Sequence, residues 1–144
     1  MPRHPKSTGE RTEAHVLAAL VEVYDSVLIP WGENQRYDFV VQDGQNGFLR
    51  VQAKTGRLRS GAVRFNTCSS TAHHRPPGQR GGDMHDYRGD ADLFAVHCQE
   101  TGAVYVVPVR DVGRREASLR VTPPRNGQRT GIRFAADHQI HPPG

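Results

Sequence analysis

The apolar residues near the start of the chain recur at helical spacing. The positions that fit an i, i+3, i+4 pattern are Val16, Leu17, Leu20, Val21 and Tyr24. This spacing is typical of a helix that buries one face, and it predicts a helix from about Gly9 to Tyr24. Thr8 is a candidate N-cap, and Glu10 would fall in the first turn, where a carboxylate is favourable.

Glu13 is the unusual residue of this helix because it precedes Val16 and Leu17 on the apolar stripe. A carboxylate at the end of a buried face needs a partner or has a function, since an unpaired buried charge is costly. Glu13 is therefore a candidate functional residue.

Short apolar runs separated by turn residues make up most of the remaining chain. Residues 37–41 and 48–54 flank the segment 43–47, which contains Asp-Gly and Asn-Gly, and this arrangement predicts a β-hairpin. Further strands are expected over 27–29, 62–66, 92–98 and 103–109, with weaker ones near 118–122 and 131–135. Residues 67–91 have the composition of a long loop. A helix followed by a run of strands predicts a small α+β or α/β domain.

The chain of 144 residues is long enough for one domain with a single core. Composition divides it into a flexible N-terminal arm over 1–8, a folded domain over 9–113, and a basic Arg/Pro/Gly-rich extension over 114–144. The two cysteines, Cys68 and Cys98, do not form a disulfide framework. No apolar run resembles a signal core or a membrane span, so we expect a cytoplasmic protein with reduced thiols.

Charge is distributed unevenly. The net charge is +4, and no acidic residue occurs from Gly44 to Gly82. The basic residues of that stretch are Arg50, Lys54, Arg57, Arg59, Arg64, Arg75 and Arg80. A basic surface favours a polyanionic partner such as nucleic acid, and the alternative is a solvated arginine-rich surface.

The candidate chemistry lies on the predicted hairpin. Gln52 and Lys54 are two residues apart on one strand and share a face, and the partner strand can place Asp38 beside them. Asp38, the Gln52 amide and the Ala53 carbonyl are hard oxygen ligands of the kind that Mg²⁺ prefers. Lys54 could stabilise developing negative charge. The alternative is structural, with Asp38 in a salt bridge to Arg36 or Lys54 and an exposed strand face.

Other polar groups form weaker candidates. Cys68, His73, His74, His85 and Cys98 suggest zinc, but their spacing matches no compact zinc pattern. Tyr87, Arg88, Asp90 and Asp92 could contact DNA or brace a site. Trp31 could stack at the mouth of a site, although a lone Trp is more often a core residue.

Three segments carry a family resemblance. They are residues 6–13, 29–38 and 51–57, and the similarity continues through 65–67, 87–92 and 104–109. The chain from about Lys6 to Gly113 resembles the PD-(D/E)XK nucleases, and more narrowly their group I intron-associated homing endonucleases. The resemblance implies a restriction-endonuclease-like core, in which helices flank a mixed sheet. It also implies Mg²⁺ dependence, with Mn²⁺ as a substitute, and cleavage of double-stranded DNA.

The resemblance also assigns roles. Glu13 would be the helix carboxylate, with Glu10 as the alternative on a nearby face. Asp38 would be the central metal ligand, and Gln52 and Lys54 would be the last two motif positions. Gln52 departs from the superfamily, where this position is usually acidic, and its neutral side chain lowers the expected metal affinity. The arginines expected to contact DNA are Arg36, Arg57, Arg59, Arg64, Arg75, Arg80 and Arg88.

The sequence thus predicts a Mg²⁺-dependent DNA endonuclease. One domain would carry one active site, so cutting both strands would require a homodimer or homotetramer. Two other readings stay open within nucleic-acid biology, namely a Holliday-junction-resolvase-like or repair nuclease and a catalytically inactive DNA-binding module. A plain structural or interaction protein is the remaining alternative.

Overall fold

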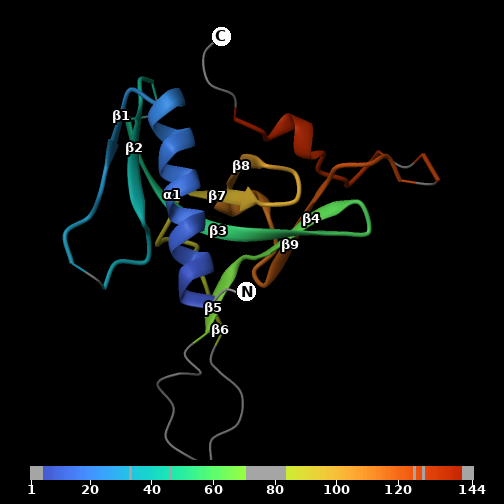
Figure 1. The fold of residues 1–144 in the computed structure, drawn as a ribbon, viewed down its shortest axis with the longest axis horizontal. Helices are drawn as coiled ribbons and strands as arrows, with labels where there is room; N and C mark the ends of the chain where they lie inside the picture. Colours follow the sequence, from blue (N-terminus) through green and yellow to red (C-terminus); the bar gives the residue numbers. More distant parts are fainter. Residues whose placement is uncertain are drawn as a thin grey trace, which may run out of the picture.

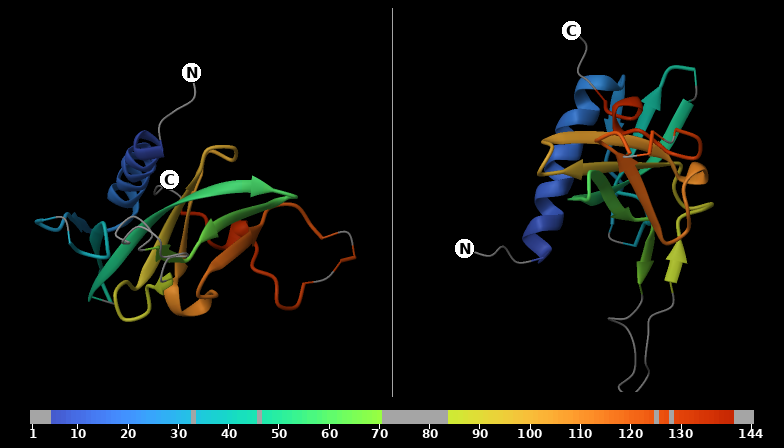
Figure 2. Two further views of the ribbon diagram at one scale, coloured as in Figure 1. Left: turned by 90° about the horizontal axis from the view of Figure 1, so that it is seen from below. Right: turned by 90° about the vertical axis from the view of Figure 1, so that its right-hand side faces the viewer.

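The structure is a computed structural model that describes residues 5–32, 34–45, 47–70, 84–124, 126–127 and 129–140. It places one long helix on one side of a curved sheet (Figures 1 and 2). The elements of the main sheet and its helix are α1 (Pro5–Val23), β1 (Ser26–Leu28), β2 (Phe39–Asp43), β3 (Gly47–Arg59), β4 (Ala62–Asn66), β7 (Leu93–Cys98), β8 (Ala103–Pro108) and β9 (Glu116–Arg120). A separate two-stranded sheet joins β5 (Cys68–Ser70) to β6 (Met84–Asp86), and short 3₁₀ turns span Val109–Asp111 and Ala135–Asp137.

The central element is β3, which is 13 residues long and changes partners along its length. Its first part pairs with β2 in antiparallel register, ending where Phe39 lies opposite Val51. Its middle part pairs with β7 in parallel, and its last residues, 57–59, pair with β4. Because β2 stops at Phe39 while β3 continues, the sheet opens into a fork just beyond this point.

Side-chain alternation on β3 gives the sheet two different faces. Val51 and Ala53 point toward α1 and pack with its buried Val16 and Leu20. Burial of each such side chain contributes about 1.5–3 kcal/mol. Gln52 and Lys54 point the other way. A second cluster covers that face and contains Phe65, Tyr87, Phe94, Val96, Val107 and Leu119.

The mixed α+β architecture expected from the sequence is confirmed. Residues 62–66 form the predicted strand without any shift, and the other main strands differ by a few residues. The helix begins earlier than predicted, at Pro5, so Thr8 lies inside it and is not its N-cap. The strand predicted near 131–135 is also wrong, since Phe134 forms only an isolated bridge to Arg120.

Two segments that the sequence suggested to be irregular or peripheral take part in the fold. The loop expected over 67–91 contains β5 and β6, which project on the side where α1 begins (Figure 1). Residues 71–83 of that loop lie outside the described residues. Beyond Gly113, β9 pairs with β4 and its Leu119 is fully buried, so the extension contributes a strand to the sheet.

None of the helical segments described here is both long enough and apolar enough to cross a lipid bilayer.

Candidate active site

Asp38 lies at the point where the sheet forks. Its backbone N–H donates to the carbonyl of Val51 at 2.8 Å. The backbone N–H of Ala53 donates to Asp38 Oδ2 at 2.9 Å. The carboxylate therefore replaces the strand partner that Ala53 would otherwise have had, and it is fixed against β3. Within the described part of the chain, Oδ1 has no donor and remains available.

The carbonyl of Ala53 faces the same opening. The N–H and C=O of one strand residue point to the same edge of the strand, and the Ala53 N–H points to Asp38. The Gln52 side chain reaches this carbonyl, with Nε2 donating to the Ala53 oxygen at 3.3 Å. Rotation of the amide would instead present Oε1 to the opening. The fork thus gathers several oxygen donors.

Glu13 of α1 is an exposed residue and does not end a buried face, and its carboxylate lies close enough to Asp38 for the two charges to interact. Burial raises the pKa of Glu13, and the negative charges of Asp38 and Glu10 raise it further. Burial likewise raises the pKa of Asp38, although the Ala53 amide and the Lys54 charge act in the opposite direction. Two ionised carboxylates in this setting repel each other and lack full hydration. The assignment of Glu13, or of Glu10 in its place, as the helix carboxylate stays a prediction.

A divalent cation fits this donor set. It would offset the repulsion between Glu13 and Asp38, and hard cations accept carboxylate, amide and carbonyl oxygens together with water. Among the residues that the structure describes, no three His, Cys, Asp or Glu side chains gather into a metal-binding group. A cation here would therefore depend on two carboxylates, Gln52, the Ala53 carbonyl and water.

Lys54 is held on the face of β3 opposite α1. Its Nζ donates to the carbonyl of Cys68 at 3.1 Å and to the hydroxyl of Tyr87 at 3.3 Å. It also lies 4.6 Å from the centre of the Tyr87 ring. Tyr87 is buried, so these contacts fix the ammonium group against a rigid partner.

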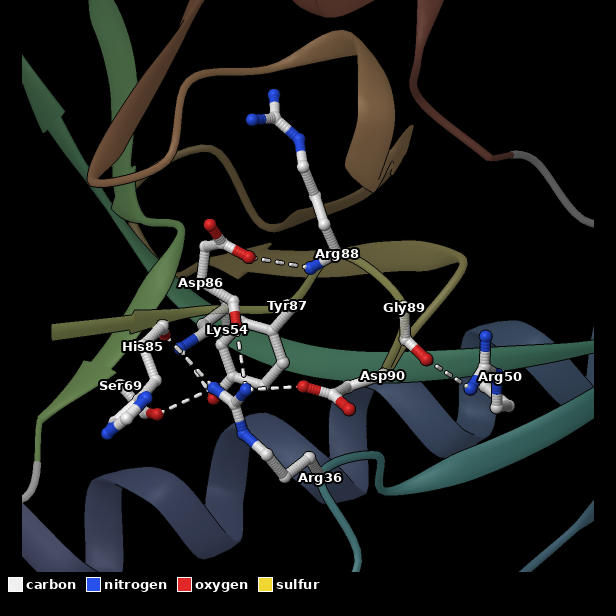
Figure 3. A network of polar contacts seen from close by, with 10 residues as sticks. All are labelled: Arg36, Arg50, Lys54, Ser69, His85, Asp86, Tyr87, Arg88, Gly89 and Asp90. Carbon is white, nitrogen blue, oxygen red and sulfur yellow. Dashed lines mark hydrogen bonds and ion pairs between the residues drawn. The ribbon is translucent and has the colours of Figure 1, made fainter.

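Arg36 connects the loop before Asp38 to the small β5–β6 sheet (Figure 3). Its guanidinium donates to Ser69 Oγ at 2.7 Å, to the carbonyls of His85 and Asp86, and to Asp90 Oδ2 at 2.6 Å. The guanidinium also lies over the Tyr87 ring, 4.1 Å from its centre. One aromatic ring thus braces both Arg36 and Lys54.

The alternative in which Asp38 forms a salt bridge to Arg36 or Lys54 is wrong for the described residues. Arg36 pairs with Asp90, and Lys54 donates to Cys68 and Tyr87. Asp38 is therefore held by backbone groups and is not neutralised by either cation.

Asp92 and Arg50 brace the start of β7. Asp92 Oδ2 accepts from the Arg50 backbone N–H at 2.8 Å and from its Nε at 3.2 Å. These bonds lower the pKa of Asp92 despite some burial. Asp92 therefore joins β3 to β7 and does not face the fork.

The remaining predicted arginines lie on the surface. Arg57 and Arg64 are exposed and directly opposite each other on β3 and β4, with exposed Arg59 close by. Arg88 is exposed and donates to the carbonyl of Val112 at 2.9 Å. Arg75 and Arg80 lie outside the described residues. The assignment of these arginines to DNA contacts stays a prediction.

Several expectations for other residues are corrected or extended. Trp31 is not a core residue, because 97% of it is exposed. Cys68 and Cys98 are buried free thiols. Sequence reasoning did not identify Cys68 and Ser69 as supports of the site. No side-chain pattern could have revealed Cys68, since it contributes a backbone carbonyl.

Comparison with known proteins agrees with this geometry. No curated protein matches the chain. Among solved structures, a bacterial homing endonuclease is similar with a TM-score of 0.69, at 20% sequence identity, over 95% of this chain and 89% of that one. This likeness confirms the restriction-endonuclease-like fold. The model of the PD-(D/E)XK endonuclease family matches residues 3–141. The chain therefore belongs to the PD-(D/E)XK endonuclease family.

Proposed function

We propose that this protein is a Mg²⁺-dependent endonuclease that hydrolyses phosphodiester bonds of double-stranded DNA, with Mn²⁺ as a substitute ion. The observation that carries the proposal is the position of Asp38, which the Ala53 N–H holds at the fork between β2 and β3 beside the Gln52 amide. Burial and the charge of Asp38 raise the pKa of Glu13, and this supports a role for both carboxylates in holding a cation. The similar solved structure is a homing endonuclease, and we propose the same class of activity here.

The ligands proposed for the ion are Asp38, Glu13, the Ala53 carbonyl and the Gln52 amide oxygen. When bound, the ion would lower the pKa of a water molecule and polarise a phosphoryl oxygen. Asp38 can bind the ion without moving, because the Ala53 amide already fixes the orientation of its carboxylate through Oδ2. Gln52 would first have to turn its amide, since Nε2 faces the Ala53 carbonyl.

Lys54 is proposed to stabilise the negative charge that develops on the phosphate. An ammonium group has three N–H donors. Two of them are directed to Cys68 and Tyr87, which leaves one for a phosphate oxygen. Because these partners hold Lys54 in place beforehand, little reorganisation is needed during the reaction, and such groups contribute about 10²–10³ in rate.

The substrate would be held by the basic surface beside the site. Arg57 and Arg59 are exposed on β3, the strand that also carries Gln52 and Lys54, and Arg64 is exposed on the neighbouring strand β4. Arg36 is better placed to position the loop before Asp38, given its four protein acceptors. Each chain offers one such site, so we propose a homodimer or homotetramer for double-strand cleavage.

A catalytically inactive DNA-binding module is the second candidate. The specific observation in its favour is that neutral Gln52 takes the place of the usual motif acid and donates its amide to the proposed Ala53 ligand. Such a protein would bind DNA in a salt-dependent manner without cutting it.

The deciding experiment is cleavage of supercoiled plasmid DNA with Mg²⁺, with Mn²⁺ and with EDTA. We expect nicked and linear products only with a divalent ion, and loss of cleavage in Asp38→Asn and Lys54→Ala. Asp111→Asn is the matched control, because Asp111 is exposed and lies after β8. Unchanged cleavage in the first two variants would refute the mechanism. Salt-sensitive binding without cleavage by the wild-type protein would favour the inactive module.

A further inference from the structure

A second polar pocket lies between the first half of α1 and the end of the β3–β7 pair. Its volume is about 680 Å³, and its lining includes Arg11, Thr12, His15, Thr55, Arg57 and His97. Thr55 and His97 are direct partners across β3 and β7. Thr55 projects to the helix side of the sheet, whereas the adjacent Lys54 projects to the other side. None of the proposed active-site residues, Asp38, Glu13, Gln52 and Lys54, is among the described residues that line this pocket.

The lining is rich in hydrogen-bond donors and positive charge. Two arginines and two histidines face the cavity, and no carboxylate is among the described residues that line it. Thr12 and Thr55 join their hydroxyl groups across α1 and β3 at 2.6 Å. One of the two hydroxyl protons serves this bond, so the other stays available to an acceptor. Such a lining suits an anion and repels a cation.

The two histidines are held face to face. The His15 and His97 rings stack with centroids 4.1 Å apart and planes 8° from parallel. His97 is buried, and its burial together with the nearby charge of His15 lowers its pKa. The stacked pair therefore places ring N–H donors at the wall of the pocket, where they can donate to an anion.

Arg57 lies on β3, two residues beyond Thr55, and it faces Arg64 on the neighbouring strand β4. Like charges on facing positions repel each other, and the carboxylate of Glu100, which accepts from the Leu58 N–H, lies close enough to Arg57 to offset part of this repulsion. Both arginines line a shallow depression that adjoins the pocket and shares Thr55 and Arg57 with it. Glu116 is the one acidic residue among the described residues that line this depression. The basic surface therefore runs from Arg11 on α1 to Arg64 on β4.

We propose that this pocket binds a phosphodiester group of the nucleic-acid backbone, away from the one that is cleaved. The cavity, of about 680 Å³, is larger than a single phosphate, and the depression at Arg64 adjoins it, so that the two together have room for neighbouring groups of a phosphate–sugar chain. The identification of the polymer as nucleic acid rests on the proposed function. The inference that the pocket binds an anion depends only on the residues described above.

The first test measures the pocket without any nuclease activity. Inorganic phosphate is titrated into the full-length protein at one fixed pH, and the side-chain resonances of the histidines are followed by NMR. We expect saturable shifts at His15 and His97 and none at His85 or His138, which lie elsewhere. Equal small shifts at all four histidines, or no shift at any of them, would refute the proposal that this pocket binds phosphate.

The second test measures duplex DNA binding as a function of salt in the non-cleaving Asp38→Asn background. Loss of one phosphate contact reduces the slope of log K against log salt by about 0.9. We expect this change in Arg11→Gln, which removes a positive charge from the pocket, and no change in Arg110→Gln. Arg110 is the matched control because it follows β8 at the Leu93 end of the β7–β8 pair, whereas the pocket lies at the Cys98 end.

The outcomes separate the two proposals. If the wild-type protein cleaves DNA and Arg11→Gln has an unchanged salt slope, this inference fails and the proposed function stands. If cleavage is absent while phosphate shifts both histidines and Arg11→Gln lowers the slope, the nuclease proposal fails and the phosphate pocket stands.

Discussion

Replacing Asp38 with asparagine or with alanine separates its charge from its hydrogen bond. In the wild-type protein, Oδ2 accepts from the Ala53 N–H at 2.9 Å. Asparagine keeps an acceptor oxygen in that position and removes the negative charge. Alanine removes both. The two variants thus report separately on the electrostatic cost of the site and on the bond that holds the fork.

The sign of the charge effect follows from the raised pKa of Asp38. A carboxyl group whose pKa is higher in the folded chain binds protons more tightly there, so stability falls as pH rises through the folded-state pKa. Near neutral pH the full cost is present. We therefore expect Asp38→Asn to melt at a higher temperature than the wild-type protein in EDTA.

The size of the hydrogen-bond effect follows from the burial of Ala53, which is only 8% exposed. A buried N–H left without an acceptor costs about 1–3 kcal/mol. For a domain of this size, 1 kcal/mol changes Tm by about 2–4 °C. Asp38→Ala should therefore melt roughly 2–12 °C below Asp38→Asn.

Scanning calorimetry in EDTA and in excess Mg²⁺ measures both effects. An ion at 100 times its Kd stabilises the folded state by about 2.7 kcal/mol, so Mg²⁺ should raise the Tm of the wild-type protein. That rise should be lost in both variants. Equal stabilisation of all three proteins by Mg²⁺, or an alanine variant that melts above the asparagine variant, would refute this account of Asp38.

Three further predictions test other parts of the account. A Cβ on Gly56 would lie 2.7 and 2.8 Å from two buried valine methyl groups, whereas one on Gly9 in α1 meets nothing within 4 Å. In thermal melts, Gly56→Ala should be less stable than the wild-type protein by about 1–3 kcal/mol, and Gly9→Ala should be more stable by roughly 1 kcal/mol. The reverse order of stability would contradict the packing of β3. Gln52→Glu adds a third carboxylate to the fork, so it should lower both the Mg²⁺ concentration for half-maximal cleavage and the Tm in EDTA. An unchanged Mg²⁺ requirement would exclude Gln52 from the metal site. The pKa values of both site carboxylates are raised, so protons should begin to compete with Mg²⁺ at a pH above the usual pKa range of carboxylates. The Mg²⁺ concentration for half-maximal cleavage, measured at several pH values, should therefore increase as the pH falls toward that range. A Mg²⁺ requirement that does not change with pH would contradict this.

The parts of the fold that the sequence predicted are those that repeat locally. The stripe from Val16 to Leu20 identified the helix, and Asp-Gly with Asn-Gly between apolar runs identified the hairpin that carries Asp38. The same pattern placed Gln52 and Lys54 on one face. Each of these signals comes from neighbouring residues and needs no tertiary information.

The parts that the sequence did not predict depend on distant contacts. The strands β5 and β6 have three residues each and pair across residues 71–83, so no local periodicity marks them. The second half of β3 is polar, and there its antiparallel partner changes from β2 to β4. The sequence pattern therefore predicts a shorter strand than the one in the structure. The support of Lys54 by a backbone carbonyl and a distant tyrosine has no signature in the order of residues.

The central claim is that Glu13 and Asp38 hold a catalytic cation in the fork of the sheet. Single-turnover cleavage of duplex DNA over a range of Mg²⁺ concentrations, in Glu13→Gln beside Glu10→Gln, tests it most directly, because both changes remove one charge from the same helix. We expect that Glu13→Gln loses cleavage or needs far more Mg²⁺, while Glu10→Gln cleaves nearly as the wild-type protein does. Equal cleavage by the two variants, with the same Mg²⁺ dependence, would contradict it.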